Sequence, residues 1–208
     1  MKVVIISDNR THPSQILLKR SLWRHGWEFV EITVPWRGFA TKLQELAKYL
    51  RESGDEYFIM QDAFDTYCLL PPSEMPWQYA DVDGVIVSGE KACYPDPERA
   101  HHFTASSPWR YPNSGQVYGR SSRFLELIER HPVPDDVDDQ RYYTDRAIAG
   151  EVLVDDECNL FQSIAFEEPD DFDYFPNERF KFRNKKTGTF PLFAHGNGRT
   201  DMNKIYLL

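Results

Sequence analysis

The chain has 208 residues, of which 41% are hydrophobic and 14% aromatic, a composition that can build a core and excludes disorder along the whole length. Its formal net charge of −9 repels phosphate backbones and anionic lipids, which argues against a broad nucleic-acid-binding or membrane-binding surface. The three cysteines are widely spaced and form no zinc-ligand pattern, so they do not require an oxidising compartment.

The first half of the sequence alternates between apolar runs and amphipathic stretches. Strands are predicted at residues 3–7, 28–34, 57–61 and 82–88. Helices are predicted at residues 13–24 and 41–50, and the second carries apolar side chains at intervals of three and four. This order is typical of parallel β-α-β units, so we predict an α/β fold with a mostly parallel central sheet flanked by helices.

The second half of the sequence is less regular. Helices are predicted at residues 120–130 and 140–149, and residues 180–193 are predicted to form a hairpin or an edge strand. We see no internal repeat and no domain boundary, and we expect a single domain spanning residues 1–208. No apolar run reaches the length of a signal-peptide core or a membrane span, so we expect a cytoplasmic protein without a membrane partner.

Two aspartates follow the apolar run 57–61 directly. In open α/β sheets ligands bind at the carboxyl ends of strands, which is where Asp62 and Asp65 lie in this prediction. Two aspartates in one turn can converge on a hard cation, and such a cation neutralises the charge of a nucleotide diphosphate. Taken alone, however, the Asp-x-x-Asp pattern more often consists of turn-forming or helix-capping aspartates.

Three further clusters strengthen the case for a site. Residues 111–115 place an amide, a hydroxyl and a glycine in a predicted turn, which suits hydrogen bonding to a sugar. The acidic run 135–139 precedes a predicted helix, where carboxylates also serve simply to favour the helix start. His195 lies between an apolar run and a glycine turn, and its imidazole could complete a cation site, although a lone histidine is more often structural.

In their order along the chain, these segments resemble the glycosyltransferase domain of the procollagen lysyl hydroxylases and the related collagen glucosyl- and galactosyltransferases. The resemblance covers almost the whole sequence, and eight motifs in one collinear order are more specific than any of them alone. The matching residues are Trp36-Arg37-Gly38, Lys42, Asp62-Ala63-Phe64-Asp65, Ser88-Gly89-Glu90 with Cys93-Tyr94-Pro95-Asp96, Tyr111-Pro112-Asn113-Ser114-Gly115, Asp138-Asp139-Gln140 with Tyr143-Thr144, Cys158 with Phe161-Gln162, and His195-Gly196-Asn197-Gly198.

The resemblance implies a Rossmann-like glycosyltransferase fold of the GT-A type, a UDP-sugar donor and Mn²⁺. Asp62 and Asp65 match the metal-binding aspartates of the family, and His195 matches its metal-binding histidine. Lys42 matches a lysine near the donor phosphates, where a positive charge is physically sensible. We therefore expect these residues to hold a divalent cation against the diphosphate.

The resemblance also assigns residues to the donor and to catalysis. Phe64 matches an aromatic residue beside the uracil ring, and Trp36 matches a tryptophan in a mobile loop that closes on the donor. Further expected donor-binding residues are Ser7, Ser114, Gly196 and Gly198. The expected catalytic residues are Asp138, Asp139 and Asn113. Either aspartate would bind the hydroxyls of the donor sugar or act as base toward the acceptor hydroxyl, and the sequence does not separate these roles.

Three positions depart from the family pattern. Tyr94 stands where the family has tryptophan, so contacts to the acceptor or the sugar are expected to differ. Gln116 replaces a glycine after Asn-Ser-Gly, which is expected to narrow the space beside that turn. The segment between Gly38 and Lys42 is shorter, so the donor loop is expected to close differently.

The sequence therefore predicts a metal-dependent transferase that moves a hexose, glucose or galactose, from a UDP-sugar to an acceptor hydroxyl. Three alternatives stay open: an inactive relative that binds nucleotide sugar or glycan, a metal-dependent phosphohydrolase, and a transferase acting on hydroxylated bases in DNA. The DNA alternative rests on a basic run near His195, although lysines also protect the edges of sheets from aggregation. That run consists of Arg179, Lys181, Arg183, Lys185 and Lys186.

Overall fold

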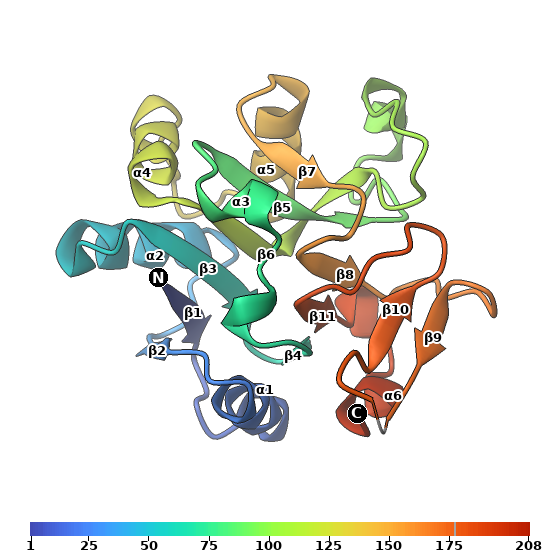
Figure 1. Ribbon diagram of the computed structural model, residues 1–208. Helices are drawn as coiled ribbons and strands as arrows, with labels where there is room; N and C mark the ends of the chain where they lie inside the picture. The colour runs from blue at the N-terminus through green and yellow to red at the C-terminus, as the bar shows by residue number, and fades with distance from the viewer. Residues whose placement is uncertain (177) are drawn as a thin grey trace.

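A computed structural model describes residues 1–176 and 178–208, without the side chain of Arg199. A six-stranded sheet forms its centre (Figure 1). The strands are β1 (Lys2–Ser7), β2 (Phe29–Thr33), β3 (Tyr57–Asp62), β5 (Val85–Glu90), β6 (Tyr111–Arg120) and β7 (Leu153–Asp155). They lie in the order β2-β1-β3-β6-β5-β7.

The central sheet is mostly parallel, as predicted. β1 pairs in parallel with both β2 and β3, and β5 pairs in parallel with β7. β6 lies antiparallel between β3 and β5, so β5 runs in the same direction as β3. Ser7, Asp62 and Glu90 consequently end their strands at the same edge of the sheet.

Helices and two small sheets cover the central sheet. The helices are α1 (Pro13–Arg24), α2 (Ala40–Ser53), α3 (Trp77–Ala80), α4 (Ser121–Arg130), α5 (Asp139–Ile148) and α6 (Asn203–Tyr206). Three short 3-10 helices are η1 (Pro72–Glu74), η2 (Pro97–His102) and η3 (Asn197–Arg199). None of the described helices is both long and apolar enough to cross a membrane.

The two faces of the central sheet are buried separately, because successive side chains of a strand point to opposite faces. Val4 and Ile6 of β1 belong to one apolar cluster, which includes the inner faces of α2, α4 and α5. Val3 and Ile5 belong to a second cluster, with Leu18 and Leu22 of α1 and with the small sheets. These strands are therefore buried on both sides, which explains their continuous apolar runs.

The small sheets lie at the lower right of Figure 1. One contains β4 (Thr66–Cys68), β11 (Phe193–His195) and β8 (Phe161–Ser163) in the order β4-β11-β8, and the other pairs β9 (Phe172–Tyr174) with β10 (Phe182–Asn184). β11 is antiparallel to β4 and parallel to β8. This sheet brings the end of the chain against the segment that follows β3.

One prediction about the second half was wrong. Residues 111–115 are not a turn but the start of β6, where the register with β5 shifts between Val87 and Ser88. Pro112 and Asn113 pair with Gly89 and Ser88 of β5, and the extra residues 114–116 form a bulge. Asn113 Oδ1 accepts a hydrogen bond from the Gly115 amide within it. Of the two alternatives predicted for residues 180–193, the edge strand is the one observed, because β10 pairs with the upstream strand β9 in a two-stranded sheet.

The close approach of β5 to residue 109 gives a first prediction. A Cβ on Gly89 would lie 1.9 Å from the backbone oxygen of Trp109, whereas one on Gly84 would have nothing within 4 Å. We expect Gly89→Ala to lower the free energy of unfolding by about 1–3 kcal/mol, because backbone must shift to make room. Gly84→Ala is the matched control, and urea unfolding of both variants is the measurement. Equal stability of the two would contradict this packing.

Candidate active site and metal centre

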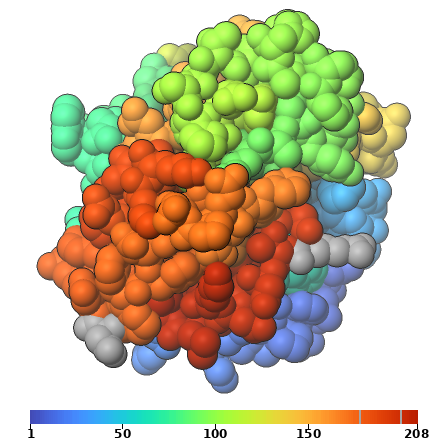
Figure 2. Space-filling view, turned by 90° about the vertical axis from the view of Figure 1, so that its right-hand side faces the viewer, coloured from blue at the N-terminus to red at the C-terminus, as the bar shows by residue number. Residues whose placement is uncertain are grey.

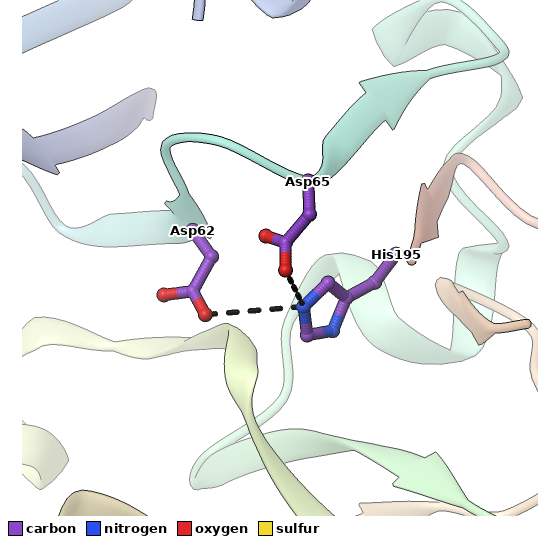
Figure 3. Close-up of side chains that lie close together, drawn as sticks. All are labelled: Asp62, Asp65 and His195. Atoms are coloured by element: carbon purple, nitrogen blue, oxygen red, sulfur yellow. Dashed lines mark ion pairs between the residues drawn. The ribbon is translucent and has the colours of Figure 1, made fainter. Parts of the chain in front are cut away.

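Asp62, Asp65 and His195 come together at the carboxyl edge of the central sheet (Figure 3). Asp62 ends β3, Asp65 lies in the turn before β4, and His195 ends β11. The Nε2 atom of His195 lies 3.8 Å from Asp62 Oδ2 and 3.4 Å from Asp65 Oδ2. One potential ligand atom from each of the three residues lies within 4.8 Å of the others.

Local pairing holds these three side chains in place. The antiparallel register of β4 and β11 sets His195 opposite Thr66, directly beside Asp65. The Thr66 hydroxyl donates to the carbonyl of Asp62, and the Gly196 amide donates to the carbonyl of Asp65 at 2.7 Å. The turn with both aspartates is thus fixed at each end by hydrogen bonds.

The packing of His195 explains why residue 115, in the bulge of β6, is a glycine. A Cβ at this position would lie 2.1 Å from Cε1 of His195, so the imidazole packs directly on the glycine backbone. The His195 side chain is only 3% exposed. The position of the His195 ring therefore depends on Gly115 as well as on the pairing of β11 with β4 and β8.

Lys42 lies between two carboxylates at the base of the site. Its Nζ is 2.6 Å from an oxygen of Asp62 and 2.6 Å from an oxygen of Asp139, with 8% of the side chain exposed. Burial acts to lower the pKa of Lys42, but Asp139 and Asp62 outweigh burial and raise it. Lys42 is therefore a permanent cation that joins α2, β3 and α5.

The three clustered side chains attract a further positive charge. Burial raises the pKa of Asp62 despite the opposing charge of Lys42. Burial acts to lower the pKa of His195, whereas Asp65 and Asp62 raise it above its ordinary value. Carboxylate oxygens and an imidazole nitrogen at this spacing fit a divalent cation.

Two cavities adjoin at this cluster, since both include Asp62 and Asp65 in their walls. The smaller has a volume of about 320 Å³ and contains four predicted donor-binding residues, Ser7, Trp36, Lys42 and Phe64. Phe64 and Trp36 are partly exposed there, at 37% and 41%. The hydroxyl of Ser7 is buried and donates to Gln15 at 2.9 Å.

The larger cavity has a volume of about 710 Å³ and contains most of the remaining predicted site residues. These are Asn113, Ser114, Asp138, Asp139, His195 and Gly198. Asp138 also caps α5, because its Oδ1 accepts from the Arg141 amide at 3.0 Å. Gly196 does not line either cavity, and packs instead against Met202.

Glu90 connects three residues that line the larger cavity, a role that the sequence analysis did not predict. Its Oε1 accepts from Asn113 Nδ2 at 3.2 Å and from Gln140 Nε2 at 2.7 Å, and its Oε2 accepts from Asn197 Nδ2 at 2.7 Å. Burial raises the pKa of Glu90 to about 7, against the opposing effect of these amide donors. The only available signal was its place in the Ser-Gly-Glu motif.

The departures from the family pattern have different outcomes. Tyr94 is 68% exposed and lines the larger cavity. Gln116 does not narrow that cavity, because its fully buried side chain donates to Gln61 at 2.8 Å.

Most of the basic run near His195 is paired within the protein. Arg179 pairs with Glu74, and Lys185 and Lys186 pair with Asp170 and Glu168.

Comparisons with known proteins place this geometry in a family. The PLOD GT domain family matches residues 25–207. The chain is 30% identical over 169 residues to uncharacterized protein R699 of Acanthamoeba polyphaga mimivirus, covering 77% of this chain and 36% of that protein. It is 24% identical over 172 residues to the multifunctional procollagen lysine hydroxylase and glycosyltransferase LH3 of Rattus norvegicus, covering 79% of this chain and 23% of that protein. The chain thus spans well under half the length of these relatives.

Solved structures are similar over nearly the whole chain. The galactosyltransferase LgtC in complex with donor and acceptor sugar analogs has a TM-score of 0.56 and 11% identity, covering 96% of this chain and 88% of that one. A glycosyltransferase involved in glycosylation of the major capsid of PBCV-1 has a TM-score of 0.53 and 15% identity, covering 98% and 97%. These likenesses confirm the predicted Rossmann-like GT-A fold. By its sequence, the chain belongs to the family of PLOD glycosyltransferase domains.

Proposed function

We propose that this chain is a glycosyltransferase that uses a divalent cation, Mn²⁺, to move a hexose from a UDP-sugar to an acceptor hydroxyl. The observation that carries the proposal is the Asp62–Asp65–His195 cluster, which lies where the two cavities meet. A diphosphate at this junction would direct its nucleoside into one cavity and its sugar into the other. Glucose and galactose are the hexoses that the family resemblance favours.

The smaller cavity supports binding of the nucleoside. Phe64 and Trp36 present partly exposed aromatic rings on which a flat base can stack. The Phe64 ring is itself supported by the His12 ring, with centroids 4.5 Å apart. The cavity also contains Lys42, which brings a positive charge to the phosphate end.

The mechanism follows from the charges at the junction. When bound, the metal ion supplies Lewis-acid stabilisation to the departing diphosphate. Lys42 adds a fixed positive charge where negative charge develops, and Asp139 holds its ammonium group in position. Because Asp139 is occupied by Lys42, we assign it to positioning rather than to proton transfer.

Asp138 is the better candidate for contact with a sugar hydroxyl or with the acceptor. One of its oxygens caps α5, and the side chain lines the larger cavity. Asn113, in contrast, uses its amide group to bind Glu90 and its carbonyl oxygen to bind Gly115, so we assign it to shaping the wall. Of the three residues that the sequence analysis expects to be catalytic, only Asp138 is therefore assigned to contact with substrate.

The decisive experiment is a UDP-release assay with a panel of nucleotide sugars, performed with Mn²⁺ and again with chelator. We expect metal-dependent release from one UDP-sugar. Cleavage of simple phosphoesters in place of nucleotide sugars would favour a phosphohydrolase. Binding of UDP without release from any sugar would instead indicate an inactive relative, and absence of both would contradict the proposal.

Removal of one metal ligand tests the cluster directly. We expect Asp65→Asn to reduce UDP release by at least about 100-fold, since a neutral amide replaces a carboxylate that holds the cation. Asp136→Asn makes the same change on an exposed residue that lines neither cavity, and is expected to leave the rate unchanged. Wild-type release by a folded Asp65→Asn protein would show that the cluster does not hold the catalytic metal.

The contact between Gly115 and His195 gives an independent prediction. We expect Gly115→Ala to weaken Mn²⁺ binding by about 10–100-fold, because the new methyl group displaces the imidazole. Calorimetric titration with Mn²⁺ is the measurement, with Gly84→Ala as the control, and circular dichroism verifies that both variants fold. Unchanged Mn²⁺ affinity in Gly115→Ala would remove His195 from the ligand set.

A further inference from the structure

Phe166 has a backbone and an exposure that are both unusual for a phenylalanine. Its φ is 57°, in the left-handed region that favours glycine, and 68% of its surface is exposed. A bulky residue persists in such a conformation only where its surroundings hold it, and such outliers gather at functional sites. Phe166 is therefore a place to look for a ligand contact.

Phe166 lies where the larger cavity meets a third one. This third cavity has a volume of about 520 Å³, and shares Ala92 and Phe166 with the larger cavity. Its remaining wall contains both hydrogen-bond donors and acceptors, among them Lys91, Arg110, Glu168 and Lys186. Figure 2 shows this face, on which the green segment around residue 100 lies against the orange and red C-terminal part.

A cluster of charged side chains around the buried Asp171 fixes the backbone near Phe166. Lys91 Nζ donates to the Phe166 carbonyl at 2.8 Å and pairs with Asp171, whose side chain is fully buried. Asp171 also pairs with Lys186 at 2.7 Å and accepts from the Glu168 amide at 2.7 Å. On the other side, the Ala165 amide donates to Asn197 Oδ1 at 3.2 Å, two residues from His195.

The ring is thus held at the mouth of the active site while its own side chain stays exposed. An exposed ring of this size has no role in the core, and nothing in its backbone preference favours this position. The charged side chains around it, in contrast, pair with one another: Lys91 and Lys186 both pair with Asp171. Phe166 thus presents an exposed aromatic ring where the larger and third cavities meet.

We propose that Phe166 binds the acceptor, and that the acceptor is a saccharide of at least two sugar units. One unit occupies the larger cavity, and the next lies across the Phe166 ring toward the third cavity. A sugar ring has an apolar face of C–H groups and an edge of hydroxyls. It therefore matches a flat ring flanked by carboxylates, amides and ammonium groups. This inference rests on the proposed function, since it assigns the acceptor side of the same site.

The experiment measures saccharide binding directly, without turnover. Mono-, di- and trisaccharides of glucose and galactose are titrated into protein with Mn²⁺ and UDP, and dissociation constants are determined by NMR. For wild type we expect disaccharides to bind more tightly than monosaccharides. We expect Phe166→Gly to weaken disaccharide binding by about 10-fold and Phe166→Tyr to retain it, because only the ring face is required.

Two comparisons separate binding from structure. Glycine accepts the left-handed conformation, so Phe166→Gly is expected to keep or raise the melting temperature while it loses the saccharide. Trp77→Ala removes another exposed aromatic side chain that lines none of these cavities, and is expected to leave saccharide binding unchanged.

Two results would overturn the proposal, and a third would overturn only the proposed transferase function. Equal disaccharide affinity in wild type and Phe166→Gly would show that the ring makes no contact. Binding of a hydroxylysine-containing peptide, but of no saccharide, would assign Phe166 to a polypeptide acceptor instead. Saccharide binding by a protein that neither binds UDP nor releases it from any UDP-sugar would mean that the proposed transferase function fails while the saccharide site holds.

Discussion

The arrangement of this site depends on one buried lysine between two carboxylates. Lys42 comes from α2, Asp62 from the end of β3 and Asp139 from the start of α5, and both ion pairs measure 2.6 Å. Loss of one partner from a buried ion pair typically costs about 3–5 kcal/mol, because an uncompensated charge is left behind. The lysine therefore joins three elements that cover the edge of the sheet, and it sets the distance from Asp62 to the acidic wall. It engages only Oδ1 of Asp62, so Oδ2 of Asp62 is left to share the proposed second cation with Asp65 and His195.

The sheet topology explains why two different environments meet at this point. β1, β3 and β5 all end at the same edge, and reversed β6 begins there. Ser7 at the end of β1 lies in the smaller cavity, which has the aromatic side chains. Glu90 at the end of β5 and Asn113 in β6 line the larger cavity, which is more polar. Asp62 ends the strand between them and belongs to both cavities. A ligand with an aromatic end, a charged middle and a hydroxylated end matches that sequence of surfaces.

Sequence patterns predicted the parts of this fold that have local causes. The helix at 13–24 and the strand that leads to Asp62 were predicted closely, because periodicity and apolar runs reflect burial along one element. β6 was missed, since Pro112 and Gly115 are typical of turns and only the pairing with β3 and β5 makes them part of a strand. The hydrogen bonds of Glu90 join residues up to 107 positions apart, which no local pattern contains. For the same reason, family resemblance was needed to identify Lys42 and to favour a metal-binding role for His195 over a structural one.

The end of β5 connects the inner and outer parts of the larger cavity. Successive side chains of an extended strand point in opposite directions, and Glu90 and Lys91 follow this rule. Glu90 binds Asn113, Gln140 and Asn197 around the inner wall, while Lys91 binds Asp171 and the carbonyl of Phe166 at the rim. A substitution that moves this strand would consequently disturb both. Because Asn197 also binds the Ala165 amide, the segment that follows His195 is hydrogen-bonded to the segment that contains Phe166 as well. The Asp62–Asp65–His195 cluster and the segment around Phe166 are thus parts of one hydrogen-bonded unit, although they come from distant segments of the chain.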